Sequence, residues 1–335
     1  MKAWILESQD RVENRPLKMA ELPDPHPAGG EVRVKNLFCG VCRTDIHIAE
    51  GDLELKKSPL VLGHEAVGLV DELGEGVRNL KKGDMVGVSW LNSTCGRCKY
   101  CTSDRENYCP EFKATGWDVD GGYAEYMVIK EEFAFPLGGM HLEPEAIAPL
   151  MCPGIAGYCA FALTGAEKGD KLGIFGFGPT AHYVLEVARY VGIEVYVSTR
   201  SERNIRAAKR AGASWAADST KEPIPTSLDS AIVFPPAGNL VELALASIER
   251  GGTLVLAPVS SSKIVINDYS KHLWGRDIRT LYNVNRKDGM AFLEIADRLK
   301  LRPSIEVFPF EELGDVLVSA KRGELNAPNA VIRIA

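Results

Sequence analysis

From about Lys171 onward, short apolar runs alternate regularly with segments of helical spacing. The run KLGIF leads through a glycine turn into the helical stretch PTAHYVLEVARYVG, and the run EVYVS follows it. The same order returns in the helical stretches ERNIRAAKRAG and LVELALASIERGG and in the apolar runs SAIVFP, TLVLAPV and IRTLYNV. Short buried strands that are joined by helices pair in parallel, with helices on both faces of the sheet. This part of the chain therefore predicts an α/β fold with a doubly wound parallel sheet.

The first half of the chain is richer in β-branched and aromatic runs. Its segments EVRVKNLF, EAVGLVDELG, DMVGVSW and YAEYMVIK are separated by Gly, Pro and Asp residues that favour turns. The tail from about Pro303 returns to strand, helix and strand, and we expect it to rejoin the β-rich half. With 335 residues, the chain is long enough for two cores. We expect one domain from residues 1–152 and 300–335, and a second from residues 153–299.

The composition excludes several classes of function. The net charge of −6 gives no basic surface for nucleic acid or an anionic membrane. No run approaches the ~18 apolar residues of a spanning helix, and the apolar stretch in the start MKAWILESQD is too short for a signal peptide. We therefore expect a cytoplasmic protein with no nucleic-acid or membrane partner. In that compartment its eight cysteines are thiols or metal ligands rather than disulfides.

The loop CGRCKYCTSDRENYC predicts a metal site. Its cysteines are separated by two, two and seven residues and are Cys95, Cys98, Cys101 and Cys109. Tetrahedral zinc takes four thiolates, and Cys-x-x-Cys steps bring adjacent sulfurs to one ion. Because four sulfurs leave no open position, this zinc would be structural. An iron–sulfur cluster and four free cysteines are the alternatives.

The turn GFGPTA follows an apolar run and opens a helical stretch. Its residues Gly176, Gly178 and Ala181 form the G-x-G-x-x-A pattern of dinucleotide-binding turns. The first glycine makes the turn, and the second lets a pyrophosphate approach the helix N-terminus. Pro179 falls in the first helical turn, where its missing N–H has no intrahelical partner to lose. The pattern predicts binding of a dinucleotide cofactor.

Six further residues can bind a metal: Cys39, Cys42, His64, Glu65, Cys152 and Cys159. Taken singly, each has an ordinary structural explanation, since a lone cysteine is usually a small buried residue. The four-cysteine loop and the motifs GVCRTDIH, GHEAVG, ENYCP, GGYAEY, APLMCPGIAGY and GFGPTA add a wider pattern. In their order and spacing they resemble the zinc-dependent medium-chain alcohol dehydrogenases over nearly the whole chain.

This resemblance implies a β-rich GroES-like catalytic domain and a Rossmann dinucleotide-binding domain. It implies reversible hydride transfer between a nicotinamide cofactor and primary alcohols or aldehydes. Cys42, His64 and Cys152 match the protein ligands of a catalytic zinc, and a fourth position is left for water or alcohol. Glu65 matches a residue that can approach this zinc from behind. The family pattern therefore gives two zinc ions per chain, one catalytic and one structural.

The segment after Cys42 carries the residues that the resemblance assigns to proton transfer. Thr44 and His47 match the family's relay from the alcohol to solvent, although Thr44 is also suited to cap a short helix. Asp45 matches the carboxylate that orients the ligand histidine. Arg43 matches a contact to the cofactor pyrophosphate, and an exposed arginine at a turn is the ordinary alternative.

Two tryptophans match pocket-lining positions of the family. These are Trp90 in VSWLN and Trp117 in GWDVDGG, and bulky indoles there would favour small or flat alcohols over branched secondary ones. Both could equally be core residues, because large aromatic side chains bury well anywhere. Trp274 is a weaker candidate for the same pocket.

The end of the second apolar run, EVYVSTRSERN, bears on the cofactor. NAD enzymes usually carry Asp or Glu about 20 residues beyond the glycines, where it binds the adenosine ribose. Thr199 stands at that position, with Arg200 next and Arg203 one helical turn on. Guanidinium groups bind phosphate, so we expect NADP(H) to be preferred. Use of NAD(H) remains the alternative, with both arginines as a solvated helix start.

Other functions are also compatible with parts of the pattern. A polyol or amino-alcohol dehydrogenase of the same family would share every motif above. A zinc-ribbon binding protein would explain the four-cysteine loop but not the glycine turn. Because family members are dimers or tetramers, we expect a homodimer or homotetramer that acts on a small alcohol or aldehyde.

Overall fold

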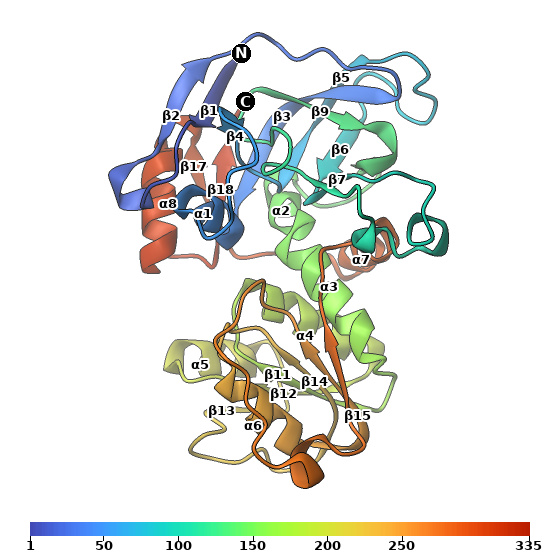
Figure 1. Ribbon diagram of the computed structural model, residues 1–335, viewed down its shortest axis with the longest axis vertical. Coiled ribbons are helices and arrows are strands. Elements are labelled where there is room, and N and C mark those ends of the chain that lie inside the picture. The colour runs from blue at the N-terminus through green and yellow to red at the C-terminus, as the bar shows by residue number, and fades with distance from the viewer. The chain divides into compact units, whose positions relative to one another are not determined.

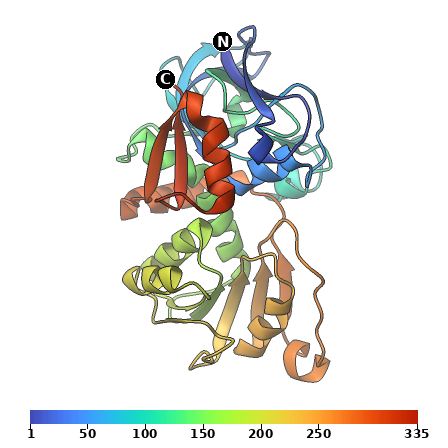
Figure 2. The ribbon, with the colours of Figure 1, turned by 90° about the vertical axis from the view of Figure 1, so that its left-hand side faces the viewer.

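The computed structural model describes residues 1–335. The chain forms two compact units: unit 1 consists of Met1–Pro153 and Asn283–Ala335, and unit 2 of Gly154–Tyr282. Both termini lie in unit 1 (Figures 1 and 2). The chain returns to unit 1 at Asn283, whereas the sequence analysis placed this boundary between residues 299 and 300. The returning segment belongs with unit 1 because Arg286 forms a 2.6 Å ion pair with the buried Glu106.

Unit 1 is built from three β-sheets. The largest has the strand order β10-β6-β5-β3-β18-β17, and β9 also pairs with β3. Its strands are β3 (Glu31–Val41), β5 (Ala66–Leu73), β6 (Met85–Val88), β9 (Tyr126–Lys130), β10 (Ala134–Pro136), β17 (Ile305–Pro309) and β18 (Asn329–Arg333). A three-stranded sheet contains β1 (Lys2–Leu6), β2 (Leu17–Glu21) and β4 (Leu60–Val61), and a two-stranded one β7 (Leu91–Ser93) and β8 (Lys113–Ala114).

Strand β3 organises the largest sheet. It pairs antiparallel with β5, β9 and β18, so residues from both ends of the chain meet on it. Val32 and Val34 are fully buried, as alternate residues on one face of a strand should be. The C-terminal strand and helix, drawn in red in Figure 2, therefore complete the fold of unit 1.

Apart from α7, the helices of unit 1 are short. The α-helices are α1 (Arg43–Glu50), α2 (Pro144–Ile147), α7 (Arg286–Leu299) and α8 (Leu313–Arg322), and α3 (Pro153–Thr164) begins at the last residue of the first segment. Single 3₁₀ turns are η1 (Val12–Asn14), η2 (Cys101–Ser103), η3 (Glu106–Tyr108), η4 (Glu131–Phe133), η5 (Ala148–Met151) and η7 (Phe310–Glu312). Helix α1 ends at Gly51, whose φ of 87° suits a glycine.

Unit 2 contains the predicted parallel sheet. Its six strands have the order β13-β12-β11-β14-β15-β16, and every neighbouring pair is parallel. The strands are β11 (Lys171–Phe175), β12 (Glu194–Ser198), β13 (Trp215–Ala217), β14 (Leu228–Val233), β15 (Ile248–Leu256) and β16 (Asp277–Thr280). With α3, the helices are α4 (Pro179–Val191), α5 (Glu202–Arg210) and α6 (Asn239–Ser247), and η6 (Tyr269–Leu273) is a π-helical turn.

The strand order of unit 2 reverses between β11 and β14. In open parallel sheets, ligands bind beyond the carboxyl ends of the strands at such a reversal. The glycine turn that follows β11 lies at this point. The sequence prediction of a doubly wound α/β fold is therefore confirmed for unit 2.

No single helix is long and apolar enough to cross a membrane; one bent pair, Pro144–Met151 with Pro153–Thr164, passes such a test by length and composition alone.

Candidate active site and cofactor-binding residues

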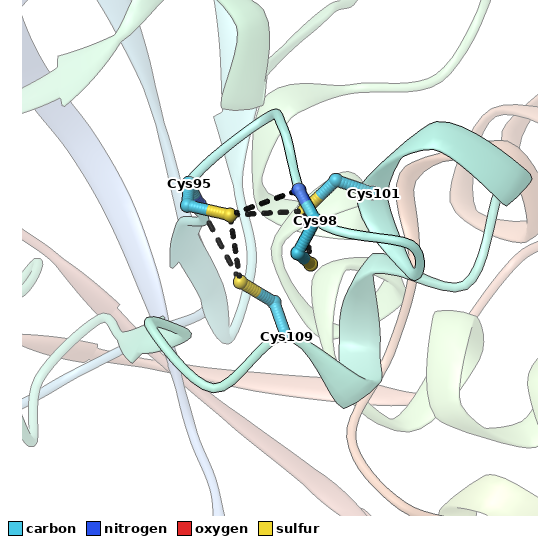
Figure 3. A group of neighbouring side chains, drawn as sticks. All are labelled: Cys95, Cys98, Cys101 and Cys109. Carbon is cyan, nitrogen blue, oxygen red and sulfur yellow. Dashed lines mark hydrogen bonds between the residues drawn. The ribbon is translucent and has the colours of Figure 1, made fainter.

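The four cysteines of the predicted structural site lie together (Figure 3). Neighbouring sulfurs are 3.5–3.9 Å apart in the pairs Cys98–Cys101, Cys95–Cys109 and Cys95–Cys101. The backbone N–H of Cys98 points at the Cys95 sulfur at 3.4 Å. Backbone N–H groups, that of Arg97 above all, lower the pKa of Cys95 to about 7. Burial raises the pKa of Cys109 to about 12, so the thiolate form is favoured at Cys95 and not at Cys109. The convergence of the four sulfurs is what fits a tetrahedral zinc.

A second cluster brings together four of the predicted ligands. The ligand atoms of Cys42, His64, Glu65 and Cys152 all lie within 4.8 Å of one another. The sulfurs of Cys42 and Cys152 are 3.8 Å apart, although 110 residues separate them in the chain. The Cys152 thiol and the nearby His64 hold the pKa of Cys42 well below its usual range. The donor set of two sulfurs and one imidazole is typical of a catalytic zinc.

The ring of His64 is the most informative part of this cluster. It is fully buried, and neither ring nitrogen makes a hydrogen bond. Nδ1 lies 3.3 Å from Oδ1 of Asp45, which leaves Nε2 for the two sulfurs. A buried ring nitrogen without a hydrogen-bond partner is costly, and a metal bound between the ring and the sulfurs would satisfy it. These residues therefore fit the zinc ion that the sequence pattern implied.

Asp45 holds several parts of the site in place. Its carboxylate accepts hydrogen bonds from the backbone N–H of Cys42 at 2.9 Å and from the Tyr123 hydroxyl at 2.8 Å. The first of these bonds fixes the start of α1. Asp45 and Tyr123 are both fully buried, so the contact is shielded from water. Tyr123 was not identified from the sequence as a site residue, although it stands in the quoted motif GGYAEY.

Glu65 is almost fully buried behind the cluster. Burial, followed by the proximity of Cys42, raises the pKa of its carboxyl group well above the usual value. Its side chain occupies the space beside Gly40, where a Cβ atom would overlap the Glu65 carboxylate. Gly40 is thus a second residue that the sequence analysis missed. The only indication of its importance in the local sequence is its position between the two cysteines of the segment FCGVC.

The predicted relay residues lie on α1. Thr44 Oγ1 is 3.6 Å from the sulfur of Cys42, which places the hydroxyl beside this group of candidate zinc ligands. His47 Nδ1 lies 2.7 Å from Oδ2 of Asp52, an acidic partner that the sequence analysis did not single out. Arg43 is exposed and donates a 3.4 Å hydrogen bond to the carbonyl oxygen of Lys321 in α8.

The two predicted pocket tryptophans form one aromatic wall beside His64. The ring of Trp90 meets that of His64 edge to face, with a centroid distance of 5.0 Å. Trp117 stacks on Trp90 at 5.9 Å and donates a hydrogen bond to the carbonyl oxygen of Glu54. Trp274 is not part of this wall. It lies in unit 2 with 58% of its surface exposed and packs against Arg250.

The dinucleotide turn has the geometry that its glycines suggested. Gly176 has a φ of 85°, and a Cβ atom there would overlap Pro235. Gly178 precedes the first turn of α4, and a Cβ atom there would meet no atom within 4 Å. Nothing in the protein requires glycine at residue 178, but its small size leaves the N-terminus of α4 open to a ligand. Ala181 is fully buried in the packing of α4.

The end of β12 shows one feature that the sequence did not. Thr199 is mostly buried, and its backbone N–H donates to the carbonyl oxygen of Ala217. Arg200 and Arg203 are exposed at the start of α5. Asp218 directly follows β13. Hydrogen bonds from Thr220, then the charges of Lys221 and Arg200, lower the pKa of its carboxyl group. An ionised carboxylate thus lies near the expected phosphate contact.

Comparison with known proteins decides the family. The model of the alcohol dehydrogenase GroES-like domain matches residues 28–139. A probable alcohol dehydrogenase, AdhA, of Mycobacterium tuberculosis (strain CDC 1551 / Oshkosh) is 38% identical over 331 residues, 97% of this chain and 95% of that protein. The chain belongs to the zinc-dependent medium-chain alcohol dehydrogenase family. This confirms the family predicted from the motifs.

Two further alcohol dehydrogenases give the same result. An alcohol dehydrogenase of Geobacillus stearothermophilus is 36% identical over 92% of this chain and 94% of its own. The structure of a cinnamyl alcohol dehydrogenase from Sorghum bicolor matches with a TM-score of 0.88 and 26% identity, covering 99% of this chain and 97% of that chain. The GroES-like and Rossmann assignments are therefore confirmed, and the protein is an alcohol dehydrogenase.

Proposed function

We propose that this alcohol dehydrogenase catalyses reversible hydride transfer between primary alcohols or aldehydes and NADP(H), with a catalytic zinc held by Cys42, His64 and Cys152. The observation that carries the proposal is the buried His64 ring, which has no hydrogen-bond partner and faces two sulfurs. When bound, zinc supplies a Lewis acid for the oxygen of the alcohol or aldehyde. Glu65 lies in the same cluster and is the candidate for transient approach to the metal.

The other residues of unit 1 would orient the ligands and move the proton. Asp45 fixes the His64 ring and the start of α1. Thr44, beside Cys42, would receive the proton of the alcohol hydroxyl, and His47 would pass it toward solvent because its ring is partly exposed and paired with Asp52. Proton transfer by positioned groups of this kind contributes about 10²–10⁴-fold to rates.

The aromatic wall supports a preference for unbranched substrates. Trp90 and Trp117 are stacked within 18° of parallel, so together they present an extended rigid surface next to His64. A flat or unbranched alcohol can lie against such a surface, whereas a branched secondary carbon would collide with it. A polyol or amino alcohol would instead leave its additional polar groups facing the two indole rings without partners.

The four-cysteine loop is proposed to hold a second, structural zinc. Its four sulfurs converge, and it offers no place for a substrate oxygen. The loop also contains Glu106, whose carboxylate binds both the side chain and the backbone N–H of Arg286. A zinc in this loop would therefore stabilise the attachment of α7 to unit 1. We expect two zinc ions per chain.

The preference for NADP(H) is supported by the residues after β12. Thr199 replaces the acid that would bind a ribose hydroxyl, and Arg200 is exposed next to it. Asp218 opposes the preference for NADP(H), since its carboxylate would repel a phosphate. However, this carboxylate already accepts a hydrogen bond from Thr220 and forms an ion pair with Lys221. We therefore assign the phosphate contact to Arg200, assisted by Arg203, and retain NAD(H) as a slower alternative.

Steady-state kinetics with the purified protein test the proposal. Ethanol, 1-butanol, benzyl alcohol, 2-propanol, sorbitol and an amino alcohol are each compared with NADP and with NAD. We expect the highest kcat/KM for the unbranched primary or benzylic alcohols with NADP. A higher value for sorbitol or the amino alcohol would favour the second candidate, and a higher value with NAD would refute the assignment of Arg200.

We also propose that the chain assembles as a homodimer or homotetramer. The edge strand β16 is exposed along its whole length and carries Ile278. An exposed apolar edge is a template for pairing with a second chain. Light scattering of the protein as it elutes from a sizing column would measure the mass of the assembly.

We also propose a cytoplasmic location. None of the eight cysteines forms a disulfide in the structure, as is usual in a reducing compartment.

A further inference from the structure

Asn283 stands where the chain returns to unit 1 and touches two separate parts of that unit. Its Oδ1 accepts a 3.0 Å hydrogen bond from Nε1 of Trp90. Its Nδ2 lies 3.4 Å from the carbonyl oxygen of Asn107, in the four-cysteine loop. One amide side chain therefore joins the aromatic wall to the loop that carries the second cluster of sulfurs.

The backbone of Asn283 has a left-handed conformation. Its φ is 56°, in the left-handed region that glycine adopts most readily and asparagine more readily than most other residues. A glycine would serve the turn at least as well. What distinguishes the asparagine from a glycine is that its side chain supplies an acceptor for Trp90 and a donor for Asn107.

Besides Asn283, the contacts of Trp90 are one backbone hydrogen bond and two ring contacts. Its backbone carbonyl is held by the N–H of Thr115 at 2.9 Å. The ring lies between His64 and Trp117, and neither contact is a hydrogen bond. An indole N–H in a partly buried position needs an acceptor, and Asn283 provides it. The orientation of the ring beside His64 is thus set by a residue outside the aromatic wall.

We propose that Asn283 is a positioning residue that holds the Trp90 indole against His64 and thereby sets the substrate selectivity of the enzyme. This inference rests on the proposed function, in which Trp90 faces the substrate. With the indole held, branched secondary alcohols are disfavoured relative to unbranched primary ones. With the acceptor removed, the ring turns away from His64 and the disadvantage of the branched substrate shrinks.

Two substitutions of Asn283 separate its side chain from its backbone. Asn283→Gly removes the acceptor and suits the left-handed φ, so the turn is preserved. Asn283→Asp keeps an acceptor for Trp90 and removes the donor to Asn107. The Trp90→Phe variant and the double variant Asn283→Gly/Trp90→Phe complete a double-mutant cycle. Thermal unfolding of all five proteins shows whether each is folded.

The readout is the ratio of kcat/KM for 2-propanol to that for ethanol. We expect Asn283→Gly to raise this ratio about two- to tenfold, the effect of losing one hydrogen bond. Asn283→Asp should leave the ratio close to the wild-type value. In the Trp90→Phe background, Asn283→Gly should change the ratio no further. A structural role at the turn alone would affect both backgrounds equally.

Tryptophan fluorescence provides a readout that is independent of turnover. The difference between a protein and its Trp90→Phe counterpart isolates the emission of Trp90. We expect this component to be more readily quenched by acrylamide in Asn283→Gly than in the wild type. Equal quenching, or an unchanged selectivity ratio in Asn283→Gly, would overturn the inference. If Trp90→Phe itself leaves the ratio unchanged, the proposed aromatic wall fails as well.

Discussion

The Asp45 carboxylate lies 3.3 Å from Nδ1 of His64, and both side chains are completely inaccessible to solvent. A carboxylate in this place orients the ring and raises its basicity toward a metal on the opposite nitrogen. Asp45 also fixes the first turn of α1 through the N–H of Cys42. One side chain thus determines where two of the proposed zinc ligands stand.

Replacing Asp45 with alanine should therefore weaken zinc binding at the Cys42 cluster about 10- to 100-fold, because the loss of such a partner leaves the ring free to turn. Competition with a fluorescent zinc chelator measures the affinity directly. Asp45→Asn keeps the size and one acceptor oxygen, so its loss should be smaller. Equal affinity in wild type and Asp45→Ala would contradict the orienting role.

Gly40→Ala should damage the site through packing alone. The added methyl group would overlap the Glu65 carboxylate, and a crowded core typically loses about 1–3 kcal/mol of unfolding free energy. Gly138→Ala is the matched control, because a Cβ atom there meets nothing within 4 Å and its backbone is not left-handed. Urea unfolding of both variants makes the comparison. A Gly40→Ala protein as stable and active as the control would show that Glu65 can move aside without cost.

The two proposed zinc sites should be separable by substitution. Cys98→Ser should remove one zinc and lower the thermal midpoint, because zinc binding in the loop contributes to folding. Cys42→Ser should reduce turnover at least about 100-fold, since Lewis-acid catalysis is worth several kcal/mol. Its thermal midpoint should change less than that of Cys98→Ser. Metal analysis with thermal scans measures both effects, and a single zinc in the active wild type would refute the two-site proposal.

Arg200→Ala should raise the KM for NADP(H) about 10- to 100-fold, which corresponds to the loss of a charge-assisted hydrogen bond, and should leave the KM for NAD(H) nearly unchanged. Asp218→Asn should act in the opposite direction on NADP(H), because it removes a negative charge near Arg200. Arg206→Ala, in the helix α5 that follows Arg200, is the control. If Arg200→Ala weakened both cofactors equally, Arg200 would contact a group that they share.

At low pH, the contacts of Glu242 in unit 2 should lose their contribution to the free energy of unfolding. The pKa of Glu242 is lowered to about 2, chiefly by the His272 ring and then by Asn267, which donates to its carboxylate at 2.6 and 2.7 Å. A folded-state pKa below the unfolded value of 4.5 means that the contribution is complete above about pH 4.5. It is lost as the pH falls from there toward 2.

Glu242→Gln removes this titration. The urea midpoints of wild type and Glu242→Gln should differ most at pH 6, and the difference should shrink between pH 4.5 and pH 3.5. Circular dichroism at each pH follows the unfolding. A difference that stays constant over this range would show that the contacts of Glu242 do not depend on its charge.

Features that depend on neighbouring residues in the sequence could be predicted. The dinucleotide turn and the four-cysteine loop fall within short segments, so spacing alone indicates their geometry. The Tyr123–Asp45 hydrogen bond joins residues 78 positions apart, and no local pattern reports such a contact. The return to unit 1 at Asn283 was missed for the same reason, because the Arg286–Glu106 ion pair spans 180 residues. Gly40 is needed only because of where Glu65 lies in space.

The pairing of β18 with β3 has a consequence for synthesis of the chain. Residues 329–333 form the strand that lies between β3 and β17, so the largest sheet of unit 1 is incomplete until these residues have left the ribosome. Unit 2 is one continuous segment and has all its strands much earlier. Domains generally fold as units during translation. The unit that carries the sulfur clusters therefore waits for its last strand, while the nucleotide-binding unit is already complete.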